Sequence, residues 1–165
     1  MVDLYCGVGF FTLALAQEHG FALGIEGVRT AIERANVNAK RNQVNARFKA
    51  EWAIDLGYAV KNEIGDHHPF LIVDPARRGL EDGVFEEIME VQPVAVLYVS
   101  CGPRGLHRDM RMFLEAGWTI DFMEAYDMFP QTPHIETLTL FIPPYTCPES
   151  KWRLPTRRIS VQKMT

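Results

Sequence analysis

The sequence predicts an α/β fold, with a mainly parallel sheet and helices on both faces. Short apolar runs alternate along the chain with segments of helical periodicity, which is the pattern of repeated β-α units. The first unit joins an apolar run to a helix through the glycine-rich turn Cys6-Gly7-Val8-Gly9, and this is how a Rossmann-like unit begins. Glycines let the backbone approach a ligand closely, and the helix behind them presents free N–H groups.

The expected elements follow one another through short connections. Strands are expected at residues 1–5, 21–25, 69–73, 94–99, 118–125 and 135–142. Helices are expected at residues 10–18, 30–43, 84–91 and 105–116, the last of them ended by Gly117. Residues 46–58 are expected to hold a strand, an acidic turn and a short helix.

Composition bounds the class of protein. The chain has 165 residues, 47% of them hydrophobic and 23% charged, which suits one globular domain with a sizeable core. No apolar run approaches the roughly 20 residues that cross a bilayer. The three cysteines Cys6, Cys101 and Cys147 form no CxxC pair, which argues against a disulfide scaffold and a structural zinc site. We expect a cytoplasmic protein with no bound metal.

Charge is unevenly distributed along the chain. The net charge of −4 is unusual for a nucleic-acid binder, but residues 145–165 carry five basic side chains and one acidic one. This segment could reach a phosphate backbone, or it could be a solvated terminus. We expect one domain over residues 1–142 and a basic C-terminal extension over residues 143–165.

Cys101 is the first candidate for chemistry. It follows the apolar run at residues 94–99 after one residue, Ser100, and a Gly-Pro turn comes next, so it lies at the carboxyl end of a central strand. Ligands of open α/β sheets bind in the crevice at that edge, where a thiol is a candidate nucleophile. The alternative is a free cysteine that only fills space in the core.

Other strand ends also carry polar groups. Asp3 and Tyr5 end the first strand, Glu26 the second and Asp74 a later one, while His134 and Glu136 begin the last strand. The carboxyl ends of parallel strands meet at one edge of a sheet, so these groups can converge on one cleft with Cys101. Glu26 is placed to accept hydrogen bonds from ribose hydroxyls, or it is a surface carboxylate at a helix start.

Five motifs in fixed order resemble one family. They are DLYCGVG (residues 3–9), GIEG (24–27), DPARRG (74–79), YVSCGPRGLHRD (98–109) and DMFPQTPHIE (127–136). Together they are similar to the catalytic domain of the RNA uracil-5-methyltransferases, which make 5-methyluridine in ribosomal or transfer RNA. The resemblance implies a Rossmann-like class I methyltransferase fold over residues 1–142, with S-adenosylmethionine as cofactor and an RNA loop as substrate.

The resemblance also implies a role for each site residue. Cys101 would be the nucleophile and Glu136 the general base. Glu26 would hold the ribose hydroxyls, and Asp74 would line the cofactor pocket beside the target base. The methionine part of the cofactor would be held by the first motif, through Asp3, Tyr5, Gly7 and Gly9.

The pair of Cys101 and Glu136 has an independent chemical reason. Carbon 5 of uracil is a poor nucleophile until a thiolate adds at carbon 6 and turns the ring into an enolate. The methylated adduct still carries a proton on carbon 5, and a carboxylate must remove it before the thiolate can leave. The arginines Arg77, Arg78, Arg104 and Arg108 could activate the thiol, bind phosphate or be solvated, and the sequence leaves these alternatives open.

Several positions depart from the family pattern. The first strand begins at once, so an N-terminal RNA-binding module and a segment that completes the cofactor pocket are expected to be missing. Gly102 stands where an Asn is commoner, and Ala76 where a Pro is commoner. Phe10 replaces a small or polar residue, and we expect Phe10, Phe11 and Phe129 to be core or pocket wall, with Phe129 the best of them for stacking on a base. His134 is expected to be structural or a base contact.

Two rival functions remain open. The chain could be a non-catalytic remnant or one half of a split protein that binds cofactor or RNA only with a missing N-terminal partner. It could also methylate a small molecule, which would need neither the basic segment nor a nucleophilic cysteine.

Overall fold

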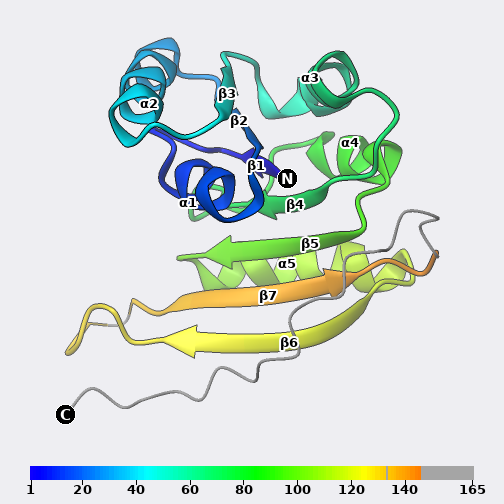
Figure 1. Ribbon diagram of the computed structural model, residues 1–165. Coiled ribbons are helices and arrows are strands. Elements are labelled where there is room, and N and C mark those ends of the chain that lie inside the picture. Colours follow the sequence, from blue (N-terminus) through cyan, green and yellow to red (C-terminus); the bar gives the residue numbers. More distant parts are fainter. Residues whose placement is uncertain (133, 146–165) are drawn as a thin grey trace.

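The computed structural model describes residues 1–132 and 134–145, and its seven described strands form one sheet (Figure 1). The strands lie in the order β3-β2-β1-β4-β5-β7-β6. Their bounds are β1 Val2–Leu4, β2 Ala22–Ile25, β3 Ala46–Lys49, β4 Phe70–Val73, β5 Ala95–Ser100, β6 Thr119–Tyr126 and β7 Glu136–Ile142.

The first five strands are parallel and the last one is not. β1 to β5 pair in parallel, which requires a crossover connection between them, while β7 runs antiparallel to both β5 and β6. The start of β7 therefore lies at the same edge of the sheet as the carboxyl ends of β1, β2, β4 and β5.

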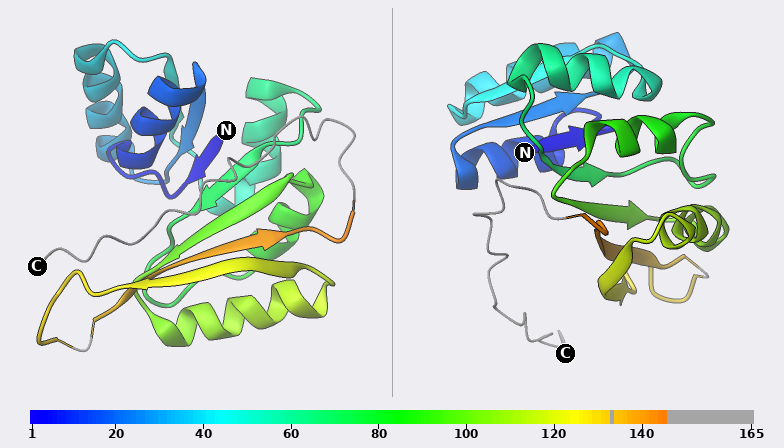
Figure 2. Two further views of the ribbon diagram at one scale, coloured as in Figure 1. Left: turned by 60° about the horizontal axis from the view of Figure 1, so that its bottom comes forward. Right: turned by 90° about the vertical axis from the view of Figure 1, so that its right-hand side faces the viewer.

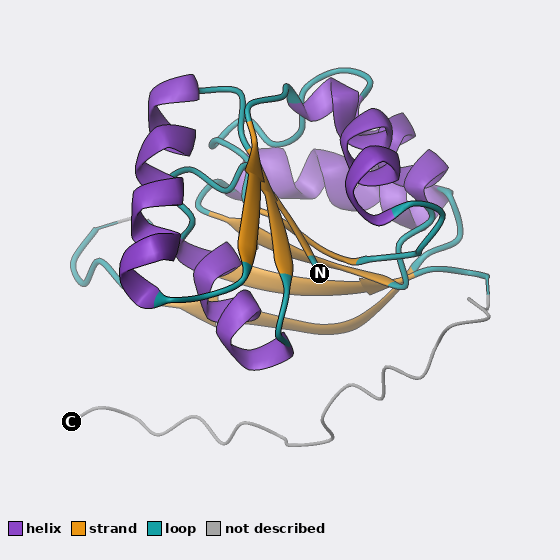
Figure 3. Cartoon of the chain, turned by 45° about the horizontal axis from the view of Figure 1, so that its top comes forward, coloured by secondary structure: helices purple, strands orange, loops and turns teal. Residues whose placement is uncertain are grey.

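The crossover helices cover both faces of the sheet (Figures 1 and 3). Helices α1 and α2 lie on one face, and α3, α4 and α5 lie on the other; the second panel of Figure 2 shows α5 end-on beside β5. Their bounds are α1 Phe10–His19, α2 Arg29–Asn42, α3 Leu56–Ile64, α4 Val84–Val91 and α5 Pro103–Glu115, with a short 3₁₀ turn η1 at Ala53–Asp55.

The core lies between the sheet and α3, α4 and α5. All three residues of β1 and all four of β2 are buried, as the continuous apolar runs of strands covered on both faces require. Phe113 of α5 stacks on Phe141 of β7 with ring centroids 4.4 Å apart, and the ring of Trp118 meets that of Phe113 edge-on at 5.2 Å. Such offset and edge-to-face pairs add to the stabilisation by area burial.

The structure confirms the predicted α/β class and most element bounds to within two residues. α3 is longer than the short helix expected, because its apolar residues Leu56, Ala59 and Val60 continue the helical period into the core. Gly117 has a φ of 85°, the left-handed conformation expected of a helix C′ residue. Phe10 was expected to be core or pocket wall, and this is wrong: its side chain is 76% exposed at the start of α1.

Two predictions concern residues that the structure does not describe. The basic side chains of the C-terminal extension and Cys147 lie outside the described residues, so the division at residue 142 stays a prediction. Among the helices of the described residues, none has the length and apolarity to cross a membrane.

Candidate active site

Four predicted carboxylates form a series along the carboxyl edge of the sheet. Burial raises the pKa of Asp3 to about 6, and the negative charges of Asp74 and Glu26 contribute to this rise. Burial also raises the pKa of Asp74, with a further contribution from the charge of Glu136. The ends of β1, β2 and β4 and the start of β7 thus place Asp3 within electrostatic range of Glu26 and Asp74, and Asp74 within range of Glu136.

Asp3 holds the start of α1. Its Oδ2 accepts the backbone N–H of Thr12 at 2.8 Å and the Thr12 hydroxyl at 2.6 Å, which satisfies a donor in the first turn of a helix that has no side-chain cap. Its Oδ1 is buried and has no hydrogen-bond partner among the described residues. Asp3 therefore fixes the glycine-rich turn from behind, and a direct contact with a cofactor stays a prediction.

The glycine-rich turn is tied to Glu26. Tyr5, Gly7 and Gly9 have φ values of 67°, 52° and 90°, so the chain takes left-handed conformations at three places between β1 and α1. One carboxylate oxygen of Glu26 accepts the N–H of Gly7 at 3.2 Å, and the other accepts the N–H of Val28 at 2.8 Å. Glu26 thereby holds the turn against the start of α2.

A cavity of about 410 Å³ opens beside this turn. Its side-chain charges are all negative, and its wall includes Trp52, whose ring packs so closely on Gly27 that a Cβ there would come within 2.6 Å of it. The Tyr5 hydroxyl donates a hydrogen bond to Glu81 across the cavity wall. The lining residues are Leu4, Tyr5, Ile25, Glu26, Gly27, Glu51, Trp52, Ala53, Ile54, Glu81, Asp82 and Val84.

Cys101 and Glu136 are the residues next to the last pair of the β5-β7 ladder. The last pair of that ladder is Ser100 with Thr137, and the Thr137 hydroxyl donates to the Ser100 carbonyl at 3.3 Å. One position further out, the antiparallel register brings Cys101 opposite Glu136, and residues opposite each other point to the same face of a sheet. Cys101 is a half-buried free thiol, and Glu136 is half-buried as well.

The Asp109 carboxylate joins the loop that follows Asp74 to the strand and helix on either side of Cys101. This carboxylate is fully buried and accepts hydrogen bonds from the Leu80 N–H at 2.8 Å and from the Tyr98 hydroxyl at 2.5 Å. It also pairs with Arg108 at 2.6 Å, and the same guanidinium donates to the Leu80 carbonyl at 2.5 Å. β5, α5 and the loop after β4 thus meet on one buried charge.

Two glycines allow the loop after β4 to touch α5. A Cβ at Gly102 would lie 2.4 Å from the carbonyl oxygen of Arg77, and one at Gly105 would lie 2.6 Å from the backbone nitrogen of Gly79. Only a residue without a side chain fits at either place while the backbones stay where they are.

The remaining candidates take minor positions. Cys6 is 6% exposed and packs against Gly24, and burial raises the pKa of its thiol. Phe129 is 51% exposed in the loop before β7. His134 is half-buried, and its backbone N–H donates to the Thr132 hydroxyl at 3.3 Å.

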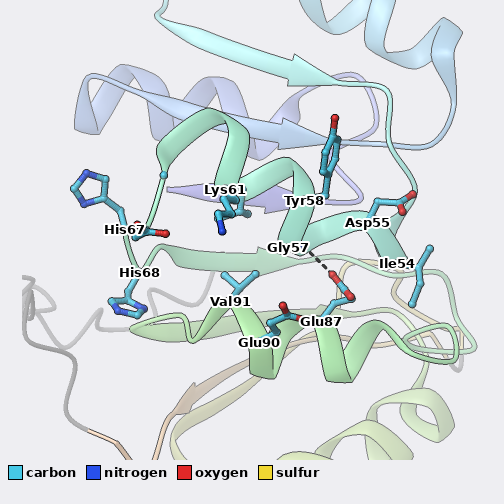
Figure 4. Close-up of a pocket in the computed structure, with 13 residues that line it drawn as sticks. Ile54, Asp55, Gly57, Tyr58, Lys61, His67, His68, Glu87, Glu90 and Val91 are labelled. Atoms are coloured by element: carbon cyan, nitrogen blue, oxygen red, sulfur yellow. Dashed lines mark hydrogen bonds between the residues drawn. The ribbon is translucent and has the colours of Figure 1, made fainter.

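A second and larger hollow, of about 510 Å³, lies between α3 and α4 (Figure 4). Tyr58 and Lys61 line it from α3, Glu87 and Glu90 from α4, and the Glu87 carboxylate accepts the Gly57 N–H at 2.8 Å. None of the strand-end side chains lines it. The smaller cavity is lined by the predicted cofactor residues Tyr5 and Glu26, while Cys101, Asp74 and Glu136 line neither of these two hollows.

Four charged or aromatic side chains of the smaller cavity were not predicted from the sequence: Glu51, Trp52, Glu81 and Asp82. Glu51 and Trp52 follow β3, and Glu81 and Asp82 follow the arginine-containing loop, so none of them belongs to a motif that directly ends a strand. The position of Glu51 and Trp52 just beyond a third parallel strand is the signal that could have found them, since strand ends line such clefts. Glu81 and Asp82 carry no comparable signal.

Comparison with known proteins agrees with this geometry. The sequence profile of the tRNA (uracil-5-)-methyltransferase family matches residues 1–142. The 23S rRNA (uracil(1939)-C(5))-methyltransferase RlmD of Aliivibrio salmonicida is 37% identical over 86% of this chain and 32% of its own length. RlmD of Aliivibrio fischeri is 38% identical over the same shares. The chain thus spans about a third of the length of these relatives.

Solved structures give the same assignment. The tRNA (uracil-54, C5)-methyltransferase of Pyrococcus abyssi, in complex with S-adenosyl-L-homocysteine, superposes with a TM-score of 0.73 and 32% identity over 86% of this chain and 33% of that chain. The magnesium protoporphyrin IX methyltransferase of Synechocystis, with bound S-adenosylmethionine, has a TM-score of 0.68 at 11% identity, which shows a common fold alone. With a matching profile over residues 1–142 and the methyltransferase fold confirmed, the chain belongs to the tRNA (uracil-5-)-methyltransferase family.

Proposed function

We propose that this chain is the catalytic part of an RNA uracil-C5 methyltransferase, which transfers a methyl group from S-adenosylmethionine to carbon 5 of a uridine through a covalent adduct with Cys101. The observation that carries the proposal is the β5-β7 register, which brings Cys101 opposite Glu136 when it is continued one residue beyond the pair of Ser100 with Thr137. Glu136 in turn lies within electrostatic range of Asp74. A non-catalytic remnant has no need of a thiol and a carboxylate opposed at the edge where α/β sheets bind ligands.

The smaller cavity fits the cofactor. S-adenosylmethionine carries a sulfonium and an ammonium group against one carboxylate. Among residues 1–132 and 134–145, the cavity wall offers carboxylates and no cationic side chain. Glu26, whose two oxygens face the glycine-rich turn and α2, would hold the ribose hydroxyls, and Tyr5 would lie beside the methionine part. When bound, the cofactor supplies the electrophilic methyl group.

Cys101 performs the first and the last step on the base. Its thiolate adds to carbon 6 of the uracil, which moves an electron pair onto carbon 5 and the carbonyl oxygen and makes carbon 5 nucleophilic. After methylation at carbon 5, the bond from Sγ to carbon 6 breaks and the thiolate leaves. Asp109 acts at a distance as a positioning residue, because it holds the loop of Asp74 against the segment of Cys101.

Glu136 removes the proton that blocks the last step. The methylated adduct is saturated at carbon 5, and its proton must go to a base as the carbon 5–carbon 6 double bond re-forms and Sγ is expelled. Glu136 lies opposite Cys101 at the start of β7, so it can reach the ring that is bonded to Sγ. Asp74 lies within electrostatic range of Glu136, since burial and then the charge of Glu136 raise the pKa of Asp74.

Covalent trapping tests this proposal. The purified chain is incubated with S-adenosylmethionine and an RNA hairpin whose loop carries 5-fluorouridine, in which fluorine replaces the proton that the base removes. The adduct should then persist on a denaturing gel for the wild-type chain, vanish in Cys101→Ala and persist in the neighbouring control Ser100→Ala. A wild-type chain that forms no adduct with RNA, while it methylates a free nucleoside or nothing at all, would overturn the proposal.

A further inference from the structure

Three arginines beside the site have no assigned role. Arg77 and Arg78 lie in the loop after β4, and Arg104 lies in the first turn of α5. All three are exposed, and none forms an ion pair with another residue in the described ranges 1–132 and 134–145. An unpaired charge at the surface is free to bind an ion of opposite sign.

The packing of the two segments gathers these arginines into one place. The carbonyl oxygen of Arg77 lies 2.4 Å from the position of a Cβ on Gly102, and the carbonyl carbon of Arg78 lies 2.7 Å from one on Gly105. The loop is therefore pressed against the first turn of α5. We name Arg77, Arg78 and Arg104 the arginine cluster; it follows directly on the two strand ends that carry Asp74 and Cys101.

The helical period directs Arg104 away from the protein. The buried residues of α5 are Gly105, Leu106, Asp109 and Phe113, which form one face. At 100° per residue, Arg104 lies on the opposite side of the helix, together with Arg111 seven residues further on. Arg111 is paired with Glu115 at 2.9 Å, so the free charge of this face is concentrated at the end near Cys101.

Arg108 differs from the arginine cluster in its contacts. Its guanidinium donates to the buried carboxylate of Asp109 and to the Leu80 carbonyl, so it belongs to the contacts around Asp109 described above. Arg108 therefore has a structural role, which was not among the three alternatives, and those alternatives stay open for the arginine cluster.

Negative and positive side chains lie in different regions around the carboxyl edge of the sheet. The cofactor cavity is walled by Glu26, Glu51, Glu81 and Asp82, and the arginine cluster lies on the side of β5 and α5. A polyanion is repelled by the first region and attracted by the second. A substrate with phosphates on both sides of a base can enter at this edge only if its backbone follows the cluster.

We propose that the arginine cluster binds the phosphate backbone of the RNA next to the target uridine and so sets the side from which the strand enters the site. The inference rests on the proposed function, since it places the substrate RNA on a particular surface of the same site. Guanidinium groups match phosphate geometry and bind it bidentately, which suits this role better than general solvation.

The test measures how RNA affinity depends on salt. A fluorescently labelled uridine-containing RNA hairpin is titrated with the chain between about 50 and 200 mM salt, a range over which each phosphate contact on a single strand contributes about 0.7 to the slope of log affinity against log salt. The variant Arg77→Gln/Arg78→Gln/Arg104→Gln should reduce this slope by about 2. Over the fourfold salt range, wild type should then lose about 15-fold more affinity than the variant.

Two control variants isolate the cluster. Arg34→Gln removes an exposed charge from α2, on the other face of the sheet, and should leave the slope unchanged. Replacement of the three arginines by lysine keeps the charge and should keep the slope. Calorimetric binding of S-adenosylhomocysteine should be the same in all of these chains, which shows that they are folded.

The outcomes separate this inference from the proposed function. An unchanged slope in the triple glutamine variant, or a wild-type chain that binds no RNA at low salt, overturns the assignment of the cluster. If the slope falls as expected but Cys101 forms no adduct, the RNA surface stands and the methyl-transfer function fails. If the adduct forms and the slope does not change, the function stands and the RNA enters elsewhere.

Discussion

Removal of the Asp109 carboxylate should destabilise the protein more than most single changes. The side chain is fully buried and is the common acceptor for the Leu80 N–H, the Tyr98 hydroxyl and the Arg108 guanidinium. In Asp109→Ala the Tyr98 hydroxyl, itself fully buried, and the Leu80 N–H lose this acceptor, and each unsatisfied group costs about 1–3 kcal/mol. The broken pair with half-exposed Arg108 adds less, because solvent screens that charge.

The expected loss for Asp109→Ala is therefore about 3–5 kcal/mol in the free energy of unfolding, which is the range for a buried pair that loses one partner. Asp109→Asn keeps the shape and one acceptor and should lose about 1–3 kcal/mol. Because a domain of this size has about 5–15 kcal/mol in total, Asp109→Asn is the variant to take into activity assays.

Urea unfolding followed by circular dichroism measures these differences. A double-mutant cycle of Tyr98→Phe with Asp109→Asn should give a coupling of at least about 0.5 kcal/mol, since the two side chains are 2.5 Å apart. A loss below about 1 kcal/mol for Asp109→Ala, or additive effects in the cycle, would refute the view that this carboxylate locks three elements together.

The remaining predictions concern single positions. The pKa of Asp3 is raised from 3.8 to about 6 in the folded state, so the folded protein binds a proton at this carboxylate more tightly than the unfolded chain does. The free energy of unfolding should therefore fall as pH rises from about 4 to about 6. In urea unfolding, wild type should lose about 3 kcal/mol over that range relative to Asp3→Asn. Gly102→Ala should lower the free energy of unfolding by about 1–3 kcal/mol, because the new Cβ would collide with the Arg77 carbonyl. Gly57→Ala should raise it by about 0.5–1 kcal/mol, because the Cβ there would meet only the tip of a flexible side chain. Phe113→Ala should lose about 3–5 kcal/mol, seen as a lower urea midpoint, and an effect under 1 kcal/mol would contradict the aromatic packing under α5.

Strand ends were predictable from the sequence because the pattern that marks them is local. Apolar runs closed by polar or glycine-rich turns show where each strand stops, and parallel topology then places Glu26, Asp74 and Cys101 on one edge. The placement of Glu136 at this edge needed the antiparallel return of β7, which the sequence did not predict. The roles of Cys101 and Glu136 come from the resemblance to the family and stay predictions.

The lock around Asp109 was not predictable because it depends on contacts between distant segments. Leu80 and Asp109 are 29 residues apart, and no local pattern shows that a backbone N–H of one segment meets the carboxylate of the other. The same holds for Trp52, whose ring reaches Gly27 across the cavity from another strand end. Phe10 was misjudged for a related reason: an apolar residue at a helix start is core only if an element covers it, and among the described residues it is left 76% exposed.

Peptide mapping of the trapped adduct is the measurement that tests the central claim most directly. The three cysteines lie in three different tryptic peptides, residues 1–29, 79–104 and 112–151, so mass spectrometry after digestion with trypsin and ribonuclease identifies the modified thiol without any variant. With RNA carrying 5-fluorouridine and with S-adenosylmethionine present, we predict a methylated fluorouridine nucleotide on the peptide 79–104, at Cys101. A modification on the peptide of Cys6 or Cys147, or an RNA methylated without any covalent intermediate, would contradict the account.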